Sequence, residues 1–257
     1  MAVEAFGQPG RVAYGRPLVE VFSVELRLNN PGGKLYGIIA FTDGVGCQYI
    51  YDRKSQKRDE GDSGSAALLN GPAGGISALG GFTIDVDLMD DIKGQFSWNV
   101  YDVTNVYDRL LQENVNGNTG SAIVNYAVFL DAAVAIVEVI LFNGDGNDPA
   151  YVYGQITARN TNFTNESTLF QKTLDEHRRV SPGKHIPLSR SVVAVPLSSS
   201  LVVGANLLVH SGYKRESERE IAKGTAEFPA QSFGTFERDI WGKYGMIRVK
   251  VTWTLDI

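Results

Sequence analysis

The amino-acid sequence predicts an all-β protein built from two tandem, related antiparallel β-sandwich units. Apolar and polar residues alternate with a period of two in many short segments, as they do along half-buried strands. Turn-forming residues recur about every 8–12 residues, the spacing typical of short antiparallel strands. A long strand, a turn rich in Gly and Asn and a second strand also occur in succession twice, at residues 18–43 and 133–160.

The repeat sets the expected domain organisation. Val19-Glu20-Val21 matches Val137-Glu138-Val139, and Leu35-Tyr36-Gly37-Ile38 matches Val152-Tyr153-Gly154-Gln155. An internal repeat of this kind indicates two related structural units. Each copy can bury one face of its strands against its own second sheet. The expected units are an N-terminal arm over residues 1–17, a first sandwich over residues 18–130 and a second sandwich over residues 131–257.

Alternation and bounding turns predict the strands of the first unit. These are residues 18–28, 35–42, 47–53 and 82–89, with one or two more strands within 95–111. The clearest alternation lies in 82–89, where the residues expected to point inward are Phe82, Ile84, Val86 and Leu88. Residues 106–113 have an alternative interpretation as a short helix. Residues 123–130 are expected to lead into the second unit.

The second unit repeats this order. The same criteria predict strands over residues 133–142, 151–158, 169–174, 191–196, 201–210, 226–228, 233–240 and 246–255. Residues 214–220, KRESERE, alternate in charge and are expected at an exposed edge or hairpin tip, where charge opposes sheet-to-sheet association. No segment of either unit gives a convincing helical pattern, which completes the all-β prediction.

Composition and charge exclude several classes of protein. Of the 257 residues, 43% are hydrophobic and 21% are charged, which is typical of a folded globular chain. The net charge of −5 is spread over interspersed acidic and basic residues, so we expect no nucleic-acid partner, which would need a basic stripe. No stretch approaches the roughly 18 apolar residues of a membrane span.

Two further features bear on compartment and cofactors. The first residues lack the basic and apolar run of a signal peptide, so we expect a cytoplasmic protein. Cys47 is the only cysteine, which rules out an internal disulfide and a thiolate metal cluster. We expect no cofactor.

Short motifs in a fixed order carry a resemblance to a known family. They are VEVF at residues 19–22, LYGIIA at 35–40, YIYDR at 49–53, LNGP at 69–72 with GI at 75–76, AIVEV at 135–139 and VKVTW at 249–253. These segments resemble the DUF6598 family, an uncharacterised domain common in grasses, and the likeness covers about residues 18–257. The sequence departs from the family where Ala73 and Gly74 replace a basic residue after the Gly-Pro.

The resemblance implies an association with stress or defence. Some plant members of the family are joined to a ribosome-inactivating N-glycosidase domain. The family has no assigned catalytic residues, so the resemblance transfers no site to this chain.

A group of aspartates suggests a calcium site. Asp85 and Asp87 project from one face of the strand 82–89, and Asp90 and Asp91 follow at its end. Hard cations such as Ca²⁺ bind several carboxylate oxygens. We therefore consider Asp85, Asp87 and Asp90 as candidate metal ligands. The alternative is a solvated outer face that runs into a turn.

Aromatic residues on one predicted strand suggest a binding patch. Tyr49, Tyr51 and Arg53 have the same parity in the strand 47–53 and should share one face. Tyrosine with arginine suits a carbohydrate site or a protein interface. The alternative is that this face packs in the core.

Two enzyme hypotheses start from reactive residue types. A hydrolase would pair Cys47 with one of the three histidines, His177, His185 or His210, within hydrogen-bond reach. Cys47 is more simply a small buried residue at the start of a strand. An N-glycosidase would use Glu237 and Arg238 beside the aromatics Trp241 and Tyr244. That activity needs a cleft supported by helices, which the sequence does not predict, so we expect no catalytic residues.

These observations favour a non-enzymatic interaction protein. We expect it to bind a partner protein or to self-associate as a homo-oligomer, because the chain is rich in sheet and has no convergent catalytic set. A module that binds carbohydrate, or one whose binding depends on Ca²⁺, is one alternative. A hydrolase or N-glycosidase is the other.

Overall fold

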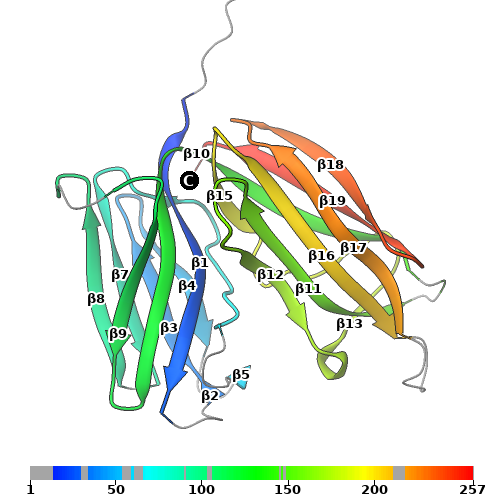
Figure 1. Ribbon diagram of the computed structural model, residues 1–257, viewed down its shortest axis with the longest axis horizontal. Helices are drawn as coiled ribbons and strands as arrows, with labels where there is room; N and C mark the ends of the chain where they lie inside the picture. Colours follow the sequence, from blue (N-terminus) through cyan, green and yellow to red (C-terminus); the bar gives the residue numbers. More distant parts are fainter. Residues whose placement is uncertain are drawn as a thin grey trace, which may run out of the picture.

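One long strand runs through the protein and organises its fold. In the computed structural model, β10 (Gly120–Asn143) is 24 residues long, and Figure 1 shows it rising through the left half of the molecule and continuing into the right half. Its first part pairs with β1 (Arg16–Leu28), and its second part pairs with β19 (Met246–Thr254). We call residues 16–132 the front half and residues 132–254 the back half.

The structure describes most of the chain. The described residues are 14–29, 34–53, 59–60, 66–89, 91–102, 106–144, 146, 149–210 and 218–256. They form antiparallel sheets with a single short 3₁₀ helix, η1 (Leu174–Glu176), so the predicted all-β class is confirmed. Residues 1–13 of the expected arm lie outside the described residues, and Arg16 and Pro17 belong to β1.

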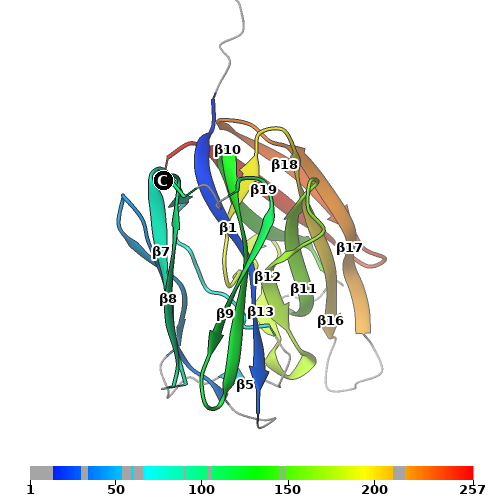
Figure 2. The same cartoon turned by 60° about the vertical axis from the view of Figure 1, so that its left-hand side comes forward.

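Two sheets share the core of the front half. The first has the order β9-β10-β1-β6, in which the new strands are β9 (Leu110–Asn116) and β6 (Ile76–Ser77). The second has the order β4-β3-β7-β8, with β4 (Cys47–Arg53), β3 (Gly37–Thr42), β7 (Gly81–Leu88) and β8 (Ile92–Asn99). A short pair, β2 (Lys34–Leu35) and β5 (Asp59–Glu60), completes the half. Figure 2 turns this half toward the reader.

Two further sheets share the core of the back half. One has the order β18-β19-β10-β15, with β18 (Gly234–Trp241) and β15 (Val192–Pro196), and β14 (Lys184–His185) also pairs with β10. The other has the order β12-β11-β16-β17, with β12 (Ser167–Lys172), β11 (Ala150–Asn160), β16 (Ser200–His210) and β17 (Glu218–Pro229). β13 (Arg178–Val180) pairs with β11.

The strand orders of the two halves correspond position by position. β9, β10, β1 and β6 of the front half correspond to β18, β19, β10 and β15 of the back half, and β4-β3-β7-β8 corresponds to β12-β11-β16-β17. The repeated Tyr-Gly pairs agree with this match. Gly37 and Gly154 have φ angles of 122° and 114°, and an added Cβ would lie 2.2 Å from the carbonyl oxygen of Asp87 or of Asn206. A backbone this close to its neighbour leaves room only for glycine.

The long observed strands coincide with predicted ones, but β17 extends over Glu218–Pro229 where only residues 226–228 were expected, and short strands such as β13 and β14 were not predicted. β7 buries Phe82, Ile84, Val86 and Leu88, so the alternation predicted for this strand is confirmed. The short-helix alternative for residues 106–113 is wrong, because β9 begins at Leu110 and pairs along β10. β10 is also one uninterrupted strand across the position of the expected boundary between residues 130 and 131.

The described residues form three clusters of buried hydrophobic side chains. The front cluster is centred on residues such as Phe41, Tyr51 and Trp98, and the back cluster on residues such as Phe170, Phe228 and Trp253. A third, smaller cluster lies where the halves meet. It consists of Leu18, Phe22, Ala127, Phe129, Ala132, Val134, Val192 and Ala194. The ring of Phe163, from the back half, lies 5.8 Å from Phe22 and 5.7 Å from Phe129 between ring centroids.

A buried ion pair also joins the halves at this junction. The Arg190 guanidinium lies 2.7 Å from the Glu20 carboxylate, and both residues are 3% exposed. Glu20 also accepts hydrogen bonds from Ser167 Oγ at 2.6 Å and from the Ala194 backbone N–H at 2.8 Å. Arg190 donates a further bond to the Val21 carbonyl at 2.6 Å. Because the carboxylate has these partners, β1 of the front half is fixed to β12 and β15 of the back half.

Replacing Arg190 should be costly. Arg190→Met leaves Glu20 charged and buried without its cation, so we expect the free energy of unfolding to fall by about 3–5 kcal/mol. Denaturant unfolding measures this loss, and adding Glu20→Gln should recover part of it. The matched control is Lys250→Met, which removes the cation beside Glu138, the residue that the repeat matches to Glu20. An equal loss in both single variants would contradict the role of the junction.

Candidate functional site

The predicted Tyr49–Tyr51–Arg53 patch does not form one face. In the pairing of β3 with β4, Tyr51 lies opposite Ile39 and Tyr49 opposite Ala40, so Ile50 is an extra, bulged residue. A bulge breaks the alternation of a strand. As a result Tyr49 is 52% exposed, whereas Tyr51 is fully buried with Ile50 in the front core. Arg53 is half-buried.

The aspartates considered for calcium have other partners. Asp85 accepts a hydrogen bond from Gln95 at 2.6 Å, and Asp87 forms an ion pair with Lys93 at 3.2 Å. Asp91 accepts hydrogen bonds from the backbone and hydroxyl of Thr119, and the hydroxyl bond lowers the pKa of Asp91. Asp90 lies outside the described residues. Within the described ranges, no group of three or more His, Cys, Asp or Glu residues gathers as a metal site would require.

The residues of the hydrolase hypothesis lie in different halves. Cys47 is exposed at the start of β4 in the front half, contrary to the expected burial. The three histidines belong to the back half. His177 contacts the Leu174 carbonyl at 2.8 Å, and His185 lies 3.8 Å from Glu138. The structure therefore brings no nucleophile and base together from this set.

A ladder of charged side chains covers the outward face of the back half. The Arg248 guanidinium on β19 forms a bidentate ion pair with the Asp239 carboxylate on β18, with N···O distances of 2.8 and 3.2 Å. The same guanidinium lies 3.6 Å from the Glu237 carboxylate. Lys250 on β19 lies 2.7 Å from Glu138 on β10. The cross-strand register sets these contacts, because Asp239 stands opposite Arg248 and Glu138 opposite Lys250. Two cations, Arg248 and Lys250, thus face three carboxylates along the ladder.

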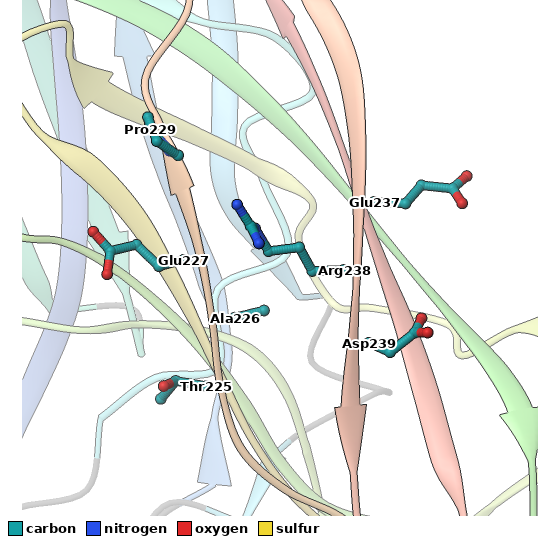
Figure 3. A pocket seen from close by; sticks show the side chains of 7 residues that line it. All are labelled: Thr225, Ala226, Glu227, Pro229, Glu237, Arg238 and Asp239. Atoms are coloured by element: carbon teal, nitrogen blue, oxygen red, sulfur yellow. The ribbon is translucent and has the colours of Figure 1, made fainter.

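The Glu237–Arg238 pair of the N-glycosidase hypothesis is split by the strand. Glu237 contacts Arg248 on the outward face of the sheet. Arg238, one residue on, lies over the ring of Phe228 at 5.8 Å. Figure 3 shows Arg238 directed toward β17, whereas Glu237 and Asp239 point to the other side of β18. An acid and a cation on opposite sides of one strand do not form a joint catalytic centre.

A hollow of about 680 Å³ lies between β17 and β18. Its lining comes from four residues of β17 within 225–229 and from residues 237–239 of β18 (Figure 3). Among the described strands, β17 pairs with β16 alone and β18 with β19 alone, so each lies at the edge of its sheet. The hollow is therefore bounded by two unpaired strand edges.

Four exposed aromatic side chains lie on the hairpin formed by β18 and β19 or directly before it. Phe233 is 77% exposed, Trp241 67%, and Phe236 and Tyr244 are each 46% exposed. The Arg219 guanidinium lies 5.7 Å above the ring of Tyr244. Large exposed aromatic groups near cations are typical of contact surfaces. From the sequence, Trp241 and Tyr244 enter only the glycosidase hypothesis, because both follow the strand predicted over residues 233–240 and its alternation gives no indication of their exposure.

The pKa of Glu138 tests the ladder directly. The hydrogen bond and charge of Lys250 lower the pKa of Glu138 below its usual value, and His185 adds to this effect. Because the folded pKa lies below the unfolded one, the stabilisation is present at neutral pH and is lost as the pH falls through the folded pKa.

Carbon-13 NMR titration of the carboxyl group should therefore give a midpoint below the usual value. Lys250→Met should move that midpoint upward. An unchanged midpoint in the variant would show that Lys250 does not hold the carboxylate.

Within the part of the chain that the structure describes, no helix is long and apolar enough to cross a membrane. No curated protein matches this chain. Among solved structures, it is similar to human GIVD cytosolic phospholipase A2 at 12% identity with a TM-score of 0.28. The match covers 95% of this chain and 33% of that one, so this chain spans about a third of the phospholipase.

A second likeness is to the C2A and C2B domains of extended-synaptotagmin 2. The identity is 12% and the TM-score 0.25, and the match covers 100% of this chain and 98% of that one. The calcium-bound form matches at 13% identity with a TM-score of 0.27, over 95% of this chain and 99% of that one. Scores this low establish no shared function. The family model described as a domain of unknown function, DUF6598, matches residues 18–251, and this chain belongs to that family.

Proposed function

We propose that this protein is a non-enzymatic interaction protein in which two related β-sandwiches form one scaffold for binding. The scaffold binds a partner protein or a second copy of itself. The β18–β19 hairpin is the contact surface.

The duplication is supported by the correspondence of strands. Each half has the same order in both sheets, and the same Tyr-Gly pair meets the same kind of backbone neighbour at Gly37 and Gly154. Three independent features therefore agree between the halves: the order of the strands, their pairing, and a glycine at the same position of the same strand. We therefore propose that the first part of β10 closes the first sandwich and its second part opens the second.

The junction supports a scaffold role. The halves share a strand, an apolar cluster and the buried Glu20–Arg190 pair. Relative motion of the halves would break these contacts and leave buried charge without a partner. A rigid body of this kind presents its surfaces at fixed distances, which lowers the entropic cost of binding.

The observation that carries the proposal is the run of exposed aromatics on the β18–β19 hairpin. Exposed Trp and Tyr side chains are the residue types that dominate binding energy at protein interfaces. Trp241 is the most informative of them, because Trp98 and Trp253 are each only 2% exposed. The separation of Cys47 from the histidines, and of Glu237 from Arg238, favours binding over catalysis.

Replacing Trp241 should weaken binding. Sedimentation velocity over a concentration series measures self-association, and affinity capture followed by rebinding of the purified candidate measures a protein partner. We expect Trp241→Ala to weaken the measured interaction by at least about tenfold, because a central aromatic contact is lost. Acrylamide quenching of Trp241 fluorescence should fall when the complex forms.

Tyr101→Ala is the matched control. Tyr101 is 86% exposed in the front half, far along the fold from the hairpin, and its loss should leave binding unchanged. A glycan array is run in parallel, and binding there would favour the carbohydrate alternative instead. A strictly monomeric protein with no partner in any of these measurements would refute the proposal.

A further inference from the structure

We propose that the hollow between β17 and β18 receives an extended polypeptide segment that carries an aromatic ring and a carboxylate on one face. This inference rests on the proposed function, since it names a docking site beside the aromatic hairpin. It is drawn from a comparison of the two halves, because the front half has the same edge with its space filled.

The two edges can be aligned through their glycines. The turn before β10 has Gly117 donating to the Gly120 carbonyl at 2.8 Å, and the turn before β19 has Gly242 donating to the Gly245 carbonyl at 3.0 Å. On the facing strands, Gly94 lies opposite Val86, and Gly224 lies opposite Ala205.

A branched residue packs over each of these glycines. A Cβ at Gly94 would lie 2.9 Å from Val115, whereas a Cβ at Gly224 would lie 3.8 Å from Ile240. Val115 and Ile240 each stand two residues before the first glycine of their turn. The same edge is therefore built twice, and the contact is looser in the back half.

In the front half, aromatic side chains fill this edge. The ring of Phe96, two residues after Gly94, lies 6.3 Å from Tyr126. Trp98 stacks on Phe82 at 5.8 Å and meets Tyr107 edge-on at 5.1 Å. The edge is closed by residues of its own half.

In the back half, Ala226 and Val251 are smaller than their counterparts Phe96 and Tyr126. Ala226 stands two residues after Gly224, at the position that Phe96 has after Gly94. Val251 corresponds to Tyr126, because it pairs with Phe236 as Tyr126 pairs with Leu111. Phe236, at the position of Leu111, is larger, but it is 46% exposed and does not line the hollow. Ala226 lines the hollow. The space that a ring occupies in the front half is thus open in the back half, which fits an aromatic side chain from a ligand.

The charge at the edge is also reversed. Glu113 stands four residues before Gly117, and Arg238 stands four residues before Gly242. In the front half, burial raises the pKa of Tyr126 and the negative charge of Glu113 raises it further, so acid and phenol are neighbours. Arg238 has the Phe228 ring as its contact, and among the described residues no carboxylate lies within ion-pair distance of it. Its fork of donors suits a carboxylate.

The strand edges select an extended ligand. In the described part of the chain, β17 pairs with β16 alone and β18 with β19 alone, and the one further backbone bond to β17 is from the Tyr244 N–H to the Glu220 carbonyl at 2.9 Å. Glu220 lies outside the lining of the hollow, so alternate backbone groups of both strands are available beside it. A segment that adds to such an edge gains main-chain hydrogen bonds, and its alternate side chains enter pockets. An aromatic ring and a carboxylate two residues apart would then both face the hollow.

Labelled synthetic peptides test the site on the full chain. The probe has roughly eight residues of alternating Thr and Val, with Phe and Asp two positions apart. One control peptide has Lys for Asp, and the other has Ala for Phe. By fluorescence anisotropy we expect the Phe/Asp peptide to bind and each control peptide to bind roughly tenfold or more weakly.

Two variants separate the parts of the site. Arg238→Glu, which restores the charge of the front half, should reverse the preference toward the Lys peptide. Ala226→Phe fills the hollow as Phe96 does and should abolish binding of all peptides. Lys93→Glu, a charge reversal on the exposed edge strand β8, is the matched control and should change nothing. If Ala226→Phe fails to fold, the reversal in Arg238→Glu decides.

Each contrary result has a distinct meaning. No binding of the Phe/Asp peptide, or the same peptide preference in wild type and Arg238→Glu, overturns the inference. A dimer of the wild-type protein that Arg238→Glu dissociates, without peptide binding, would assign the edge to a second copy and also overturn it. The proposed function is tested separately, by the effect of Trp241→Ala on self-association or partner binding, so either proposal can fail without the other.

Discussion

The backbone hydrogen bonds of β10 are the constraint on which the rest of the structure depends. One strand of 24 residues completes the first sheet of the front half and begins the first sheet of the back half. Its partners change from β1 and β9 to β19, β14 and β15 along its length. No linker separates the halves, so the orientation of one is set by the twist of a strand that also belongs to the other. The small apolar cluster and the Glu20–Arg190 pair then fix this geometry.

The two halves share one order of strands but differ in the side chains at one edge. At the front edge, aromatic rings and Val115 close the gap between the sheets. At the back edge, Ala226 leaves a hollow, Arg238 replaces an acid, and exposed aromatics follow along β18. The duplication proposed above would permit this divergence, since one copy can remain a closed support while the other accumulates contact residues. Function then resides in side chains placed on a scaffold.

Much of the fold could be predicted from the sequence, because period-two alternation is a local signal. The inward residues of β7 and the repeat around Gly37 and Gly154 are examples. The sequence predicted that Tyr49 and Tyr51 share one face. This prediction was wrong, because the bulge at Ile50 arises from the pairing of β4 with β3 and leaves no local signal in the sequence. Arg190 gave no signal, because its partner Glu20 is 170 residues away in the chain. The hollow was equally hidden, as it appears only when corresponding positions of two edges are compared in space.

Hydrogen exchange of the amides in residues 128–137 tests the shared strand most directly. If β10 joins the halves as one cooperative body, these amides should exchange only through global unfolding, as slowly as those of the flanking core strands. Exchange here that is much faster than in β1 and β19 would contradict the account. It would mean that the centre of β10 behaves as a linker and that the halves open independently.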